Sequence, residues 1–348
     1  MKGNEAVAEA SIRAGADAYF GYPITPQSEI LEYLMEHNPA ETTGMVVLQA
    51  ESEVAAINMV YGAASAGCRV LTSSSGPGIS LMMESISFLA GAELPCLLVN
   101  VSRAGPGLGT IQPSQSDYFQ CTKGGGHGDY RMLTLAPQSV QEMADFTELG
   151  FELAFKYRNP VMILTDGVIG QMMEKVVFPE HKPRKKEAEP WAVTGKPASR
   201  ERNIVTSLNL EALKHERHNI RLQAKYRRME EEDTRYETFL CEDAEYIVVA
   251  YGASARISRK AVELAREKGI KAGLFRPVTL FPFPSKALKE TAKNAKGLLS
   301  VEMNAGQMVD DVRLAVECRI PVMHWGRYGG VVHAPGEVLK AIMAFWMQ

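Results

Sequence analysis

Residues 69–101, RVLTSSSGPGISLMMESISFLAGAELPCLLVNV, indicate the fold class of this 348-residue chain. They begin and end with short apolar runs, at 69–73 and 96–101, that are typical of buried parallel strands. Between the two runs lie a polar glycine turn and a helix-like pattern at 79–90. A strand, a helix and a strand in this order predict a βαβ unit, which belongs to a parallel sheet with helices on both faces.

The same alternation continues in both directions to about residue 180 and returns after residue 240. A charged segment separates the two blocks, and we expect it to be a Pro- and Lys-rich linker followed by a long mixed-charge helix. The sequence therefore predicts two doubly wound α/β domains, 1–180 and 241–348, joined by residues 181–240. Further strands are predicted at 18–22, 45–49, 132–135, 161–165, 246–250, 272–275, 297–301 and 322–325, and further helices at 25–36, 53–66, 138–157, 254–268, 285–294, 306–316 and 336–345.

Composition excludes several functional classes. The net charge of −3 argues against a nucleic-acid-binding protein, which usually carries a basic excess. The longest strictly apolar run, 341–347, is far shorter than the ~18 residues that a membrane span needs, so we expect no membrane association. Charged residues interrupt the N-terminal region, which therefore does not resemble a secretory signal. The five cysteines show no CxxC spacing, which favours a reduced cytoplasmic protein without its own zinc or iron–sulfur site.

Two turns between predicted strands and helices contain candidate site residues. In the turn 21–28, GYPITPQS, Thr25 is placed to cap the next helix, with Pro26 at its first position. Alternatively, the Thr25 hydroxyl binds an anion or a substrate oxygen, because ligands bind at the carboxyl ends of parallel strands. The turn 73–78, SSSGPG, is compatible with a tight structural turn and with the close approach of a flat ligand.

Two charged residues are the strongest candidates for chemistry. Glu53 opens an apolar helix, where the macrodipole favours an acid, but a partly buried carboxyl group there is also suited to proton transfer. Arg103 follows a buried-type strand and precedes a long Gly-rich segment, 104–131, of the irregular kind that is often functional. Its guanidinium can bind a carboxylate bidentately or bridge loop carbonyls. His127 lies in the same segment, and we expect it to order the loop rather than to act as an acid or base.

In their order along the chain, these motifs resemble the α subunit of 2-oxoacid:ferredoxin oxidoreductases. Residues 107–131, together with 302–316 and 326–330, are more similar to the branched-chain (2-oxoisovalerate) members than to the 2-oxoglutarate members. The resemblance implies a thiamine diphosphate pyrimidine-binding domain over 1–180 and a transketolase C-terminal-like α/β domain over 241–348. The other shared motifs are GNEA at 3–6, YPITP at 22–26, ESEVAAINMVYGA at 51–63, SSSGPG at 73–78 and LAGAELP at 89–95.

The resemblance also implies roles for individual residues. Glu53 lies nine residues before Gly62 and so matches the glutamate that hydrogen-bonds N1′ of the aminopyrimidine, whereas Glu51 lacks this spacing. Thr25 matches the threonine near the reacting substrate, and Arg103 matches the arginine that binds the substrate carboxylate. The residues expected to contact the cofactor besides Glu53 are Pro23, Ile24, Ser75, Gly76 and Pro77.

The implied reaction is oxidative decarboxylation of a 2-oxoacid to acyl-coenzyme A and CO₂, with reduction of ferredoxin. The chain has no GDG motif to hold Mg²⁺ on the diphosphate and no cysteine cluster for a [4Fe-4S] centre. We therefore expect these groups on partner chains: a β subunit with the diphosphate-binding domain, and γ and ferredoxin-like δ subunits. The expected substrate is 3-methyl-2-oxobutanoate. A 2-oxoglutarate or pyruvate enzyme, and a catalytically silent assembly subunit on the same fold, are the alternatives.

Overall fold

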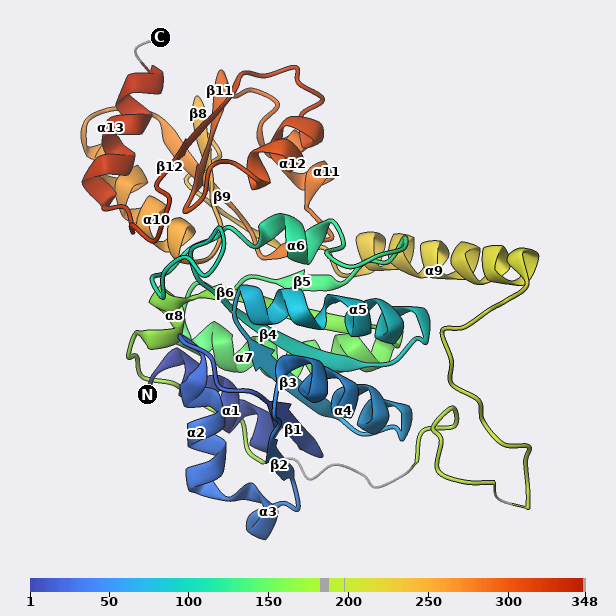
Figure 1. Cartoon of the computed structure of the whole chain (residues 1–348). Helices are drawn as coiled ribbons and strands as arrows, with labels where there is room; N and C mark the ends of the chain where they lie inside the picture. The colour runs from blue at the N-terminus through green and yellow to red at the C-terminus, as the bar shows by residue number, and fades with distance from the viewer. Residues whose placement is uncertain (182–187, 197, 347–348) are drawn as a thin grey trace.

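The computed structural model describes residues 1–348 except 182–187, 197 and 347–348, and it contains two α/β domains (Figure 1). Within the described residues, the first domain is built on a seven-stranded sheet that is parallel except for one edge strand. The predicted doubly wound fold is thereby confirmed. Across the sheet the order is β10 (Thr279–Phe281), β5 (Leu133–Leu135), β6 (Pro160–Asp166), β4 (Cys96–Ser102), β3 (Val70–Ser74), β1 (Ala18–Gly21) and β2 (Val46–Gln49).

Helices cover both faces of this sheet, because each parallel connection must cross over it in the right-handed sense. Helices α4 (Glu53–Ser65) and α5 (Pro77–Gly91) pack against each other on one face. On the other face α1 (Gly3–Arg13) packs against α2 (Ser28–His37) and α7 (Val140–Tyr157). The sequence patterns did not predict α1 (Gly3–Arg13), α3 (Pro39–Thr42), α6 (Tyr118–Thr122) or α8 (Gly167–Gln171).

The second domain contains a five-stranded sheet in the described part of the chain, again parallel except at one edge. That edge strand is β7 (Tyr236–Phe239), which lies inside the segment 181–240 and pairs antiparallel with β9 (Ala272–Pro277). The strand order is β12 (Val322–Gly326), β11 (Gly297–Glu302), β8 (Tyr246–Val249), β9 (Ala272–Pro277) and β7 (Tyr236–Phe239). Its helices are α10 (Gly252–Glu267), α11 (Ser285–Thr291), α12 (Met308–Ala315) and α13 (Pro335–Trp346).

Helix α9 (Ala212–Glu232) joins the domains and contacts the first one. The three apolar residues that the sequence places at helical spacing, Leu222, Tyr226 and Met229, are its buried residues. Its Lys225 ammonium group lies 3.2 Å from the Glu93 carboxylate, just beyond α5. No helix in the described ranges combines the length and the apolar character that crossing a membrane requires.

Buried polar contacts fix the second domain onto the first. Gln115, from the long irregular segment of the first domain, is almost fully buried. Its side-chain amide donates to the Tyr251 carbonyl at 2.9 Å and accepts from the Ser254 hydroxyl at 2.7 Å, both at the start of α10. Its carbonyl accepts from the Asn304 side chain at 2.8 Å, just after β11. Strand β10 adds a second connection, since it leaves the second domain and pairs with β5. The loops around Gln115 are therefore held between the two sheets.

Candidate active site

The predicted site residues converge at the carboxyl ends of four adjacent strands, β4, β3, β1 and β2. Thr25 follows β1, Glu53 follows β2, Gly76 follows β3 and Arg103 follows β4. Ligands bind at this edge of open α/β sheets, because the turns there are free of sheet pairing and the helix N-termini point toward it. The topology therefore brings together residues that lie up to 78 positions apart in the sequence.

Glu53 is the first residue of α4 and is buried, with 6% of its surface exposed. The preceding residue, Ser52, caps the helix by accepting from the Ala55 amide at 3.2 Å. The Glu53 carboxylate is therefore not used as a cap and extends over the turn after β3. Among the described residues it has no hydrogen-bond partner in the structure. Glu51, the alternative acid, is exposed.

Gly78 makes room for this carboxylate. A Cβ atom on Gly78 would lie 2.5 Å from Glu53 Oε1 and 2.1 Å from Ser74 Oγ, both well inside van der Waals contact. The hydroxyl groups of Ser74 and Ser75, in the same turn, are buried without a hydrogen-bond partner in the described part of the chain. Buried polar groups of this kind are usually satisfied, so their clustering beside an unpaired carboxylate indicates a place for a polar ligand.

The turn after β3 has the backbone that a close ligand approach requires. Gly76 has a positive φ of 42°, and Pro77 is the first residue of α5. The Gly76 amide donates to the side chain of Asp117. Burial raises the pKa of the Asp117 carboxyl group, while hydrogen bonds from Asn100 and the Gly76 amide oppose the shift. Asp117 thus connects the irregular segment to the turn, a role that the sequence analysis did not assign.

Arg103 lies directly above this turn. Its Cγ is 3.6 Å from where a Gly76 Cβ would stand, and its guanidinium donates to the Thr25 carbonyl at 2.9 Å. Its Nε is buried without a partner among the described residues. The arginine therefore bridges a loop carbonyl, as one interpretation of the sequence expects, and the binding of a substrate carboxylate stays a prediction.

Thr25 does not cap α2, and that prediction is wrong. The helix begins at Ser28 with Gln27 before it, because the 22–27 turn continues for two residues beyond Thr25. The buried Gln27 replaces it as the anchor of the turn, since it accepts from the Ser73 hydroxyl at 2.6 Å and thereby joins the turn to β3. Thr25 is exposed at the site, which leaves its hydroxyl accessible to a substrate. Pro23 is exposed and Ile24 is half-buried in the same turn.

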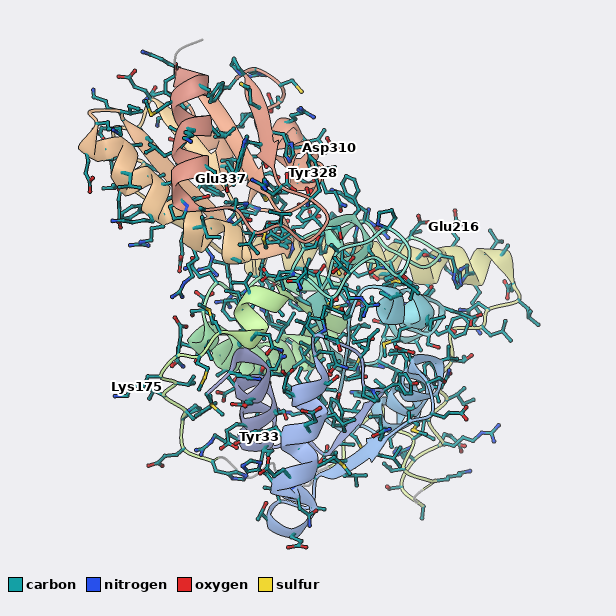
Figure 2. The ribbon with its side chains drawn as sticks, turned by 60° about the vertical axis from the view of Figure 1, so that its left-hand side comes forward. Tyr33, Lys175, Glu216, Asp310, Tyr328 and Glu337 are labelled. Atoms are coloured by element: carbon teal, nitrogen blue, oxygen red, sulfur yellow. The ribbon has the colours of Figure 1, made fainter. Side chains whose placement is uncertain are left out.

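Arg103 lines a cavity of about 650 Å³ whose walls come from both domains. The first domain supplies Gly76, Pro77 and the start of the irregular segment, including Asp117. The second domain supplies the residues after β11 and Tyr328, which is labelled in Figure 2. The second-domain motifs 302–316 and 326–330 carried the sequence resemblance but received no role in the site. The lining residues from the second domain are Asn304, Ala305, Gln307, Tyr328 and Gly329.

The EMNAGQ motif at 302–307 has a local physical explanation. Glu302 is fully buried, and its carboxylate accepts from the backbone amides of Gln307, Met308 and Val309 at 2.8–3.1 Å. It thereby satisfies the free amides at the start of α12. Gln307 then bonds the Ser116 carbonyl through its side chain at 2.7 Å. The motif holds the second-domain wall of the cavity against the irregular segment.

His127 is not part of this site. It is exposed, packs edge-on against Phe88, and its carbonyl accepts from the Ser87 hydroxyl at 2.6 Å. These contacts lie near the far end of α5 from Gly78. The expectation that His127 orders its loop fits this placement. No group of three or more His, Cys, Asp or Glu residues within the described ranges could hold a metal ion.

Comparison with known proteins agrees with the fold. A family model described as pyruvate flavodoxin/ferredoxin oxidoreductase, thiamine diphosphate-binding, matches residues 9–238. A model of pyruvate:ferredoxin oxidoreductase core domain II matches residues 244–338. Together they define a two-domain protein of the thiamine-dependent oxidoreductase class. The chain belongs to the pyruvate flavodoxin/ferredoxin oxidoreductase family.

Comparison with individual proteins shows which members of the family the chain resembles. The chain is 54% identical to the ketoisovalerate oxidoreductase subunit VorB of Methanothermobacter thermautotrophicus, over 98% of this chain and 96% of the relative. The structure is similar to that of 2-oxoglutarate:ferredoxin oxidoreductase from Magnetococcus marinus, with a TM-score of 0.86 and 27% identity; the match covers 99% of this chain and 64% of that one. A split-gene transketolase matches with a TM-score of 0.63 and 14% identity over 99% and 97% of the two chains, which shows the fold alone. The predicted family and fold class are thereby confirmed.

Proposed function

We propose that this chain is the pyrimidine-binding subunit of a 2-oxoacid:ferredoxin oxidoreductase that converts 3-methyl-2-oxobutanoate and related branched-chain 2-oxoacids to acyl-coenzyme A and CO₂. The 54% identity to a ketoisovalerate oxidoreductase subunit supports this substrate class. The observation that carries the chemistry is the buried carboxylate of Glu53 over Gly78, which has no hydrogen-bond partner within the part of the chain that the structure describes. The five free cysteines fit a reduced cytoplasmic protein.

The residues present fit the aminopyrimidine half of thiamine diphosphate. Glu53 provides a carboxylate acceptor over the turn after β3. The Ser74 and Ser75 hydroxyls in that turn are buried and have no hydrogen-bond partner among the described residues. Bound thiamine diphosphate supplies the nucleophilic carbon for the 2-oxo group and the electron sink for decarboxylation. Glu53 holds the proton at the ring nitrogen that it contacts, which is the task of a positioned acid–base group. Pro23, Ile24 and the turn at Gly76 are proposed to border the ring.

Arg103 and Thr25 are proposed to orient the substrate. Arg103 lines a cavity large enough for a small 2-oxoacid, and within the described residues its guanidinium uses one N–H donor for the Thr25 carbonyl. A guanidinium binds a carboxylate with two parallel hydrogen bonds, which fixes the direction of the 2-oxo group as well as its position. The exposed Thr25 hydroxyl lies in the turn whose carbonyl already accepts from Arg103, so it is placed to contact the same ligand.

The reaction requires partner subunits. The chain contains no GDG motif for Mg²⁺ and no cysteine cluster, so a β subunit would supply the diphosphate site. Subunits of γ and ferredoxin-like δ type would supply the [4Fe-4S] clusters that pass electrons to ferredoxin, and coenzyme A would accept the acyl group. The alternative of a silent assembly subunit is disfavoured by Glu53. Burying a carboxylate that has no hydrogen-bond partner among the described residues costs free energy, and a silent subunit would gain nothing in return.

The test is a pair of matched variants in the complex assembled with its partner subunits. Glu53→Gln should lower kcat about 10²–10⁴-fold, because the amide retains the shape but cannot manage a proton. Glu51→Gln, two residues away and exposed, should change kcat little. Turnover is measured with 3-methyl-2-oxobutanoate, coenzyme A and a low-potential dye, and assembly is measured by gel filtration. Equal activity of both variants would refute the assignment of Glu53.

A second measurement tests the substrate. The kcat/KM for 3-methyl-2-oxobutanoate should greatly exceed that for 2-oxoglutarate, because an apolar pocket leaves the second carboxylate unpaired. The acids derived from valine, leucine and isoleucine should differ much less, since one methylene is worth only ~1–3 kcal/mol. A preference for 2-oxoglutarate or pyruvate would replace the substrate but leave the proposed role of Glu53 intact.

A further inference from the structure

The connection before α9 contains an extended arm, residues 203–210, whose apolar side chains face outward. Figure 1 shows the last part of this connection passing beside the end of α5 before it enters α9. Exposure alternates strictly along the arm, with odd-numbered residues half-buried and even-numbered residues exposed. Ile204, Leu208 and Leu210 are 72%, 68% and 91% exposed. A period of two is the pattern of a β-strand with one apolar face, yet this face meets solvent.

The backbone of the arm is also unpaired. Within the described residues no backbone–backbone hydrogen bond joins any residue of 203–210 to another element. The Leu208 amide bonds only the Thr206 hydroxyl, two residues before it. An extended segment with free N–H and C=O groups and an apolar face is a template for strand addition to another chain.

The arm is attached to the first domain along its half-buried side, through Asn203, Val205 and Ser207. The Asn203 side chain donates to the Pro190 and Ala192 carbonyls at 2.7 and 2.9 Å, and the neighbouring Val193 amide bonds the Ser65 carbonyl at the end of α4. Ser207 approaches Gly91, the last residue of α5, so closely that a Cβ there would lie 3.2 Å from the serine Cβ. The arm therefore starts at the carboxyl ends of α4 and α5.

The same two helices indicate which partner covers the arm. Glu53 is the first residue of α4. In the proposed function it binds the pyrimidine end of the cofactor, and another chain holds the diphosphate end. That chain therefore lies no farther from the start of α4 than the length of the cofactor. The surface of α4 and α5 exposes Val54, Met59 and Leu81, which are 38–56% accessible. A chain seated on this surface reaches the arm where the two helices end.

We propose that residues 203–210 form a docking strand for the subunit that carries the diphosphate half-site. The arm contributes Ile204, Leu208 and Leu210 to an apolar strand edge of that subunit, and its free backbone groups pair with the same edge. The site of docking lies at the opposite ends of α4 and α5 from Glu53 and Gly78. The arm thus stabilises the complex without touching the reacting groups. This inference rests on the proposed function, which requires such a subunit.

The experiment uses the double variant Leu208→Ser/Leu210→Ser in the complex assembled with its partner subunits. Each buried leucine is worth roughly tenfold or more in affinity, so the Kd for the diphosphate-carrying subunit should rise about 10²-fold or more. Dissociation on dilution is followed by native mass spectrometry. The control is Leu314→Ser on α12, a leucine of similar exposure at 70% in the other domain, which should leave the Kd unchanged. At saturating partner concentration the double variant should retain the wild-type kcat.

Hydrogen exchange provides an independent readout. The amides of residues 203–207 should exchange rapidly in the isolated chain and become protected in the complex, because strand addition pairs them. An unchanged Kd or unprotected amides would overturn the proposal, and so would loss of a different subunit or of a dimer of this chain. None of these outcomes affects the Glu53→Gln test. Conversely, a complex that assembles through the arm but has no 2-oxoacid activity would refute only the proposed function.

Discussion

Replacing Gly78 with alanine tests whether the placement of the Glu53 carboxylate controls catalysis. The added methyl group would stand 2.5 Å from Glu53 Oε1, against an ordinary contact distance of at least 3.4 Å. The carboxylate must therefore move by about 0.9 Å, and the Ser74 hydroxyl, 2.1 Å from the same methyl group, by about 1.3 Å, unless the helix start shifts instead. Both obstructing groups, Glu53 and Ser74, are side chains that can rotate, so the fold should survive at a cost of about 1–3 kcal/mol.

The catalytic effect should be larger than the effect on stability. A displacement of about 1 Å in a catalytic constellation costs on the order of 10²-fold in rate, or about 2.7 kcal/mol of activation free energy. We therefore expect Gly78→Ala to lower kcat about 100-fold in the assembled complex. The matched control is Gly336→Ala in α13, where a new methyl group meets nothing within 4 Å. That variant should keep its activity and gain a few tenths of a kcal/mol in stability.

A double-mutant cycle shows whether the effect runs through Glu53. If alanine at 78 acts by displacing the carboxylate, Gly78→Ala combined with Glu53→Gln should be no slower than Glu53→Gln alone. The assay is dye reduction by the complex with 3-methyl-2-oxobutanoate, with thermal unfolding of the same samples as the stability control. Wild-type activity of Gly78→Ala, or additive losses in the double variant, would refute the argument.

The remaining predictions concern the substrate arginine, one buried acid and the isolated chain. Arg103→Lys should raise KM for the 2-oxoacid about 10- to 100-fold, since an ammonium group cannot form the bidentate contact; an unchanged KM would move the carboxylate site elsewhere. Burial raises the pKa of Asp166 to about 6, against amide donors from Val168, Ile169 and Ala253. The folded chain therefore binds the proton more tightly than the unfolded chain does, so this group makes stability fall as pH rises from about 4 to about 6. Asp166→Asn should remove that slope, which thermal unfolding across this range measures. The isolated chain should not oxidise 2-oxoacids even with added thiamine diphosphate and Mg²⁺; activity without partner subunits would contradict the division of the site between chains.

Local patterns were sufficient for the parallel strands and for the long helices other than α1, whose 11 residues were missed. Apolar β-branched runs such as 96–101 have few alternatives to a buried strand, and the observed strand, Cys96–Ser102, differs by one residue. Short elements were missed because their formation depends on distant partners. Strand β10 forms only against β5, about 145 residues earlier, and α6 is held by the Tyr118 hydroxyl, which donates to Asp311 at 2.5 Å. The local periodicity of apolar residues in the sequence gives no information about such long-range contacts.

The candidate site was likewise predictable from the sequence only in part. The residue types and the motif order gave Glu53, Arg103 and the Gly-rich turn, because a thiamine site requires a carboxylate at a fixed spacing from its helix glycine. The sequence placed Thr25 at the helix start, whereas the chain reaches α2 only after Gln27, which is anchored to β3 by tertiary contact. The cavity walls, the contact of Asp117 with the Gly76 turn and the space over Gly78 depend on how two sheets and their loops pack. Sequence spacing specifies which groups are available along each element. Only folding brings the ends of separate strands to one edge of a sheet, where a distance of one ångström decides whether those groups can act together.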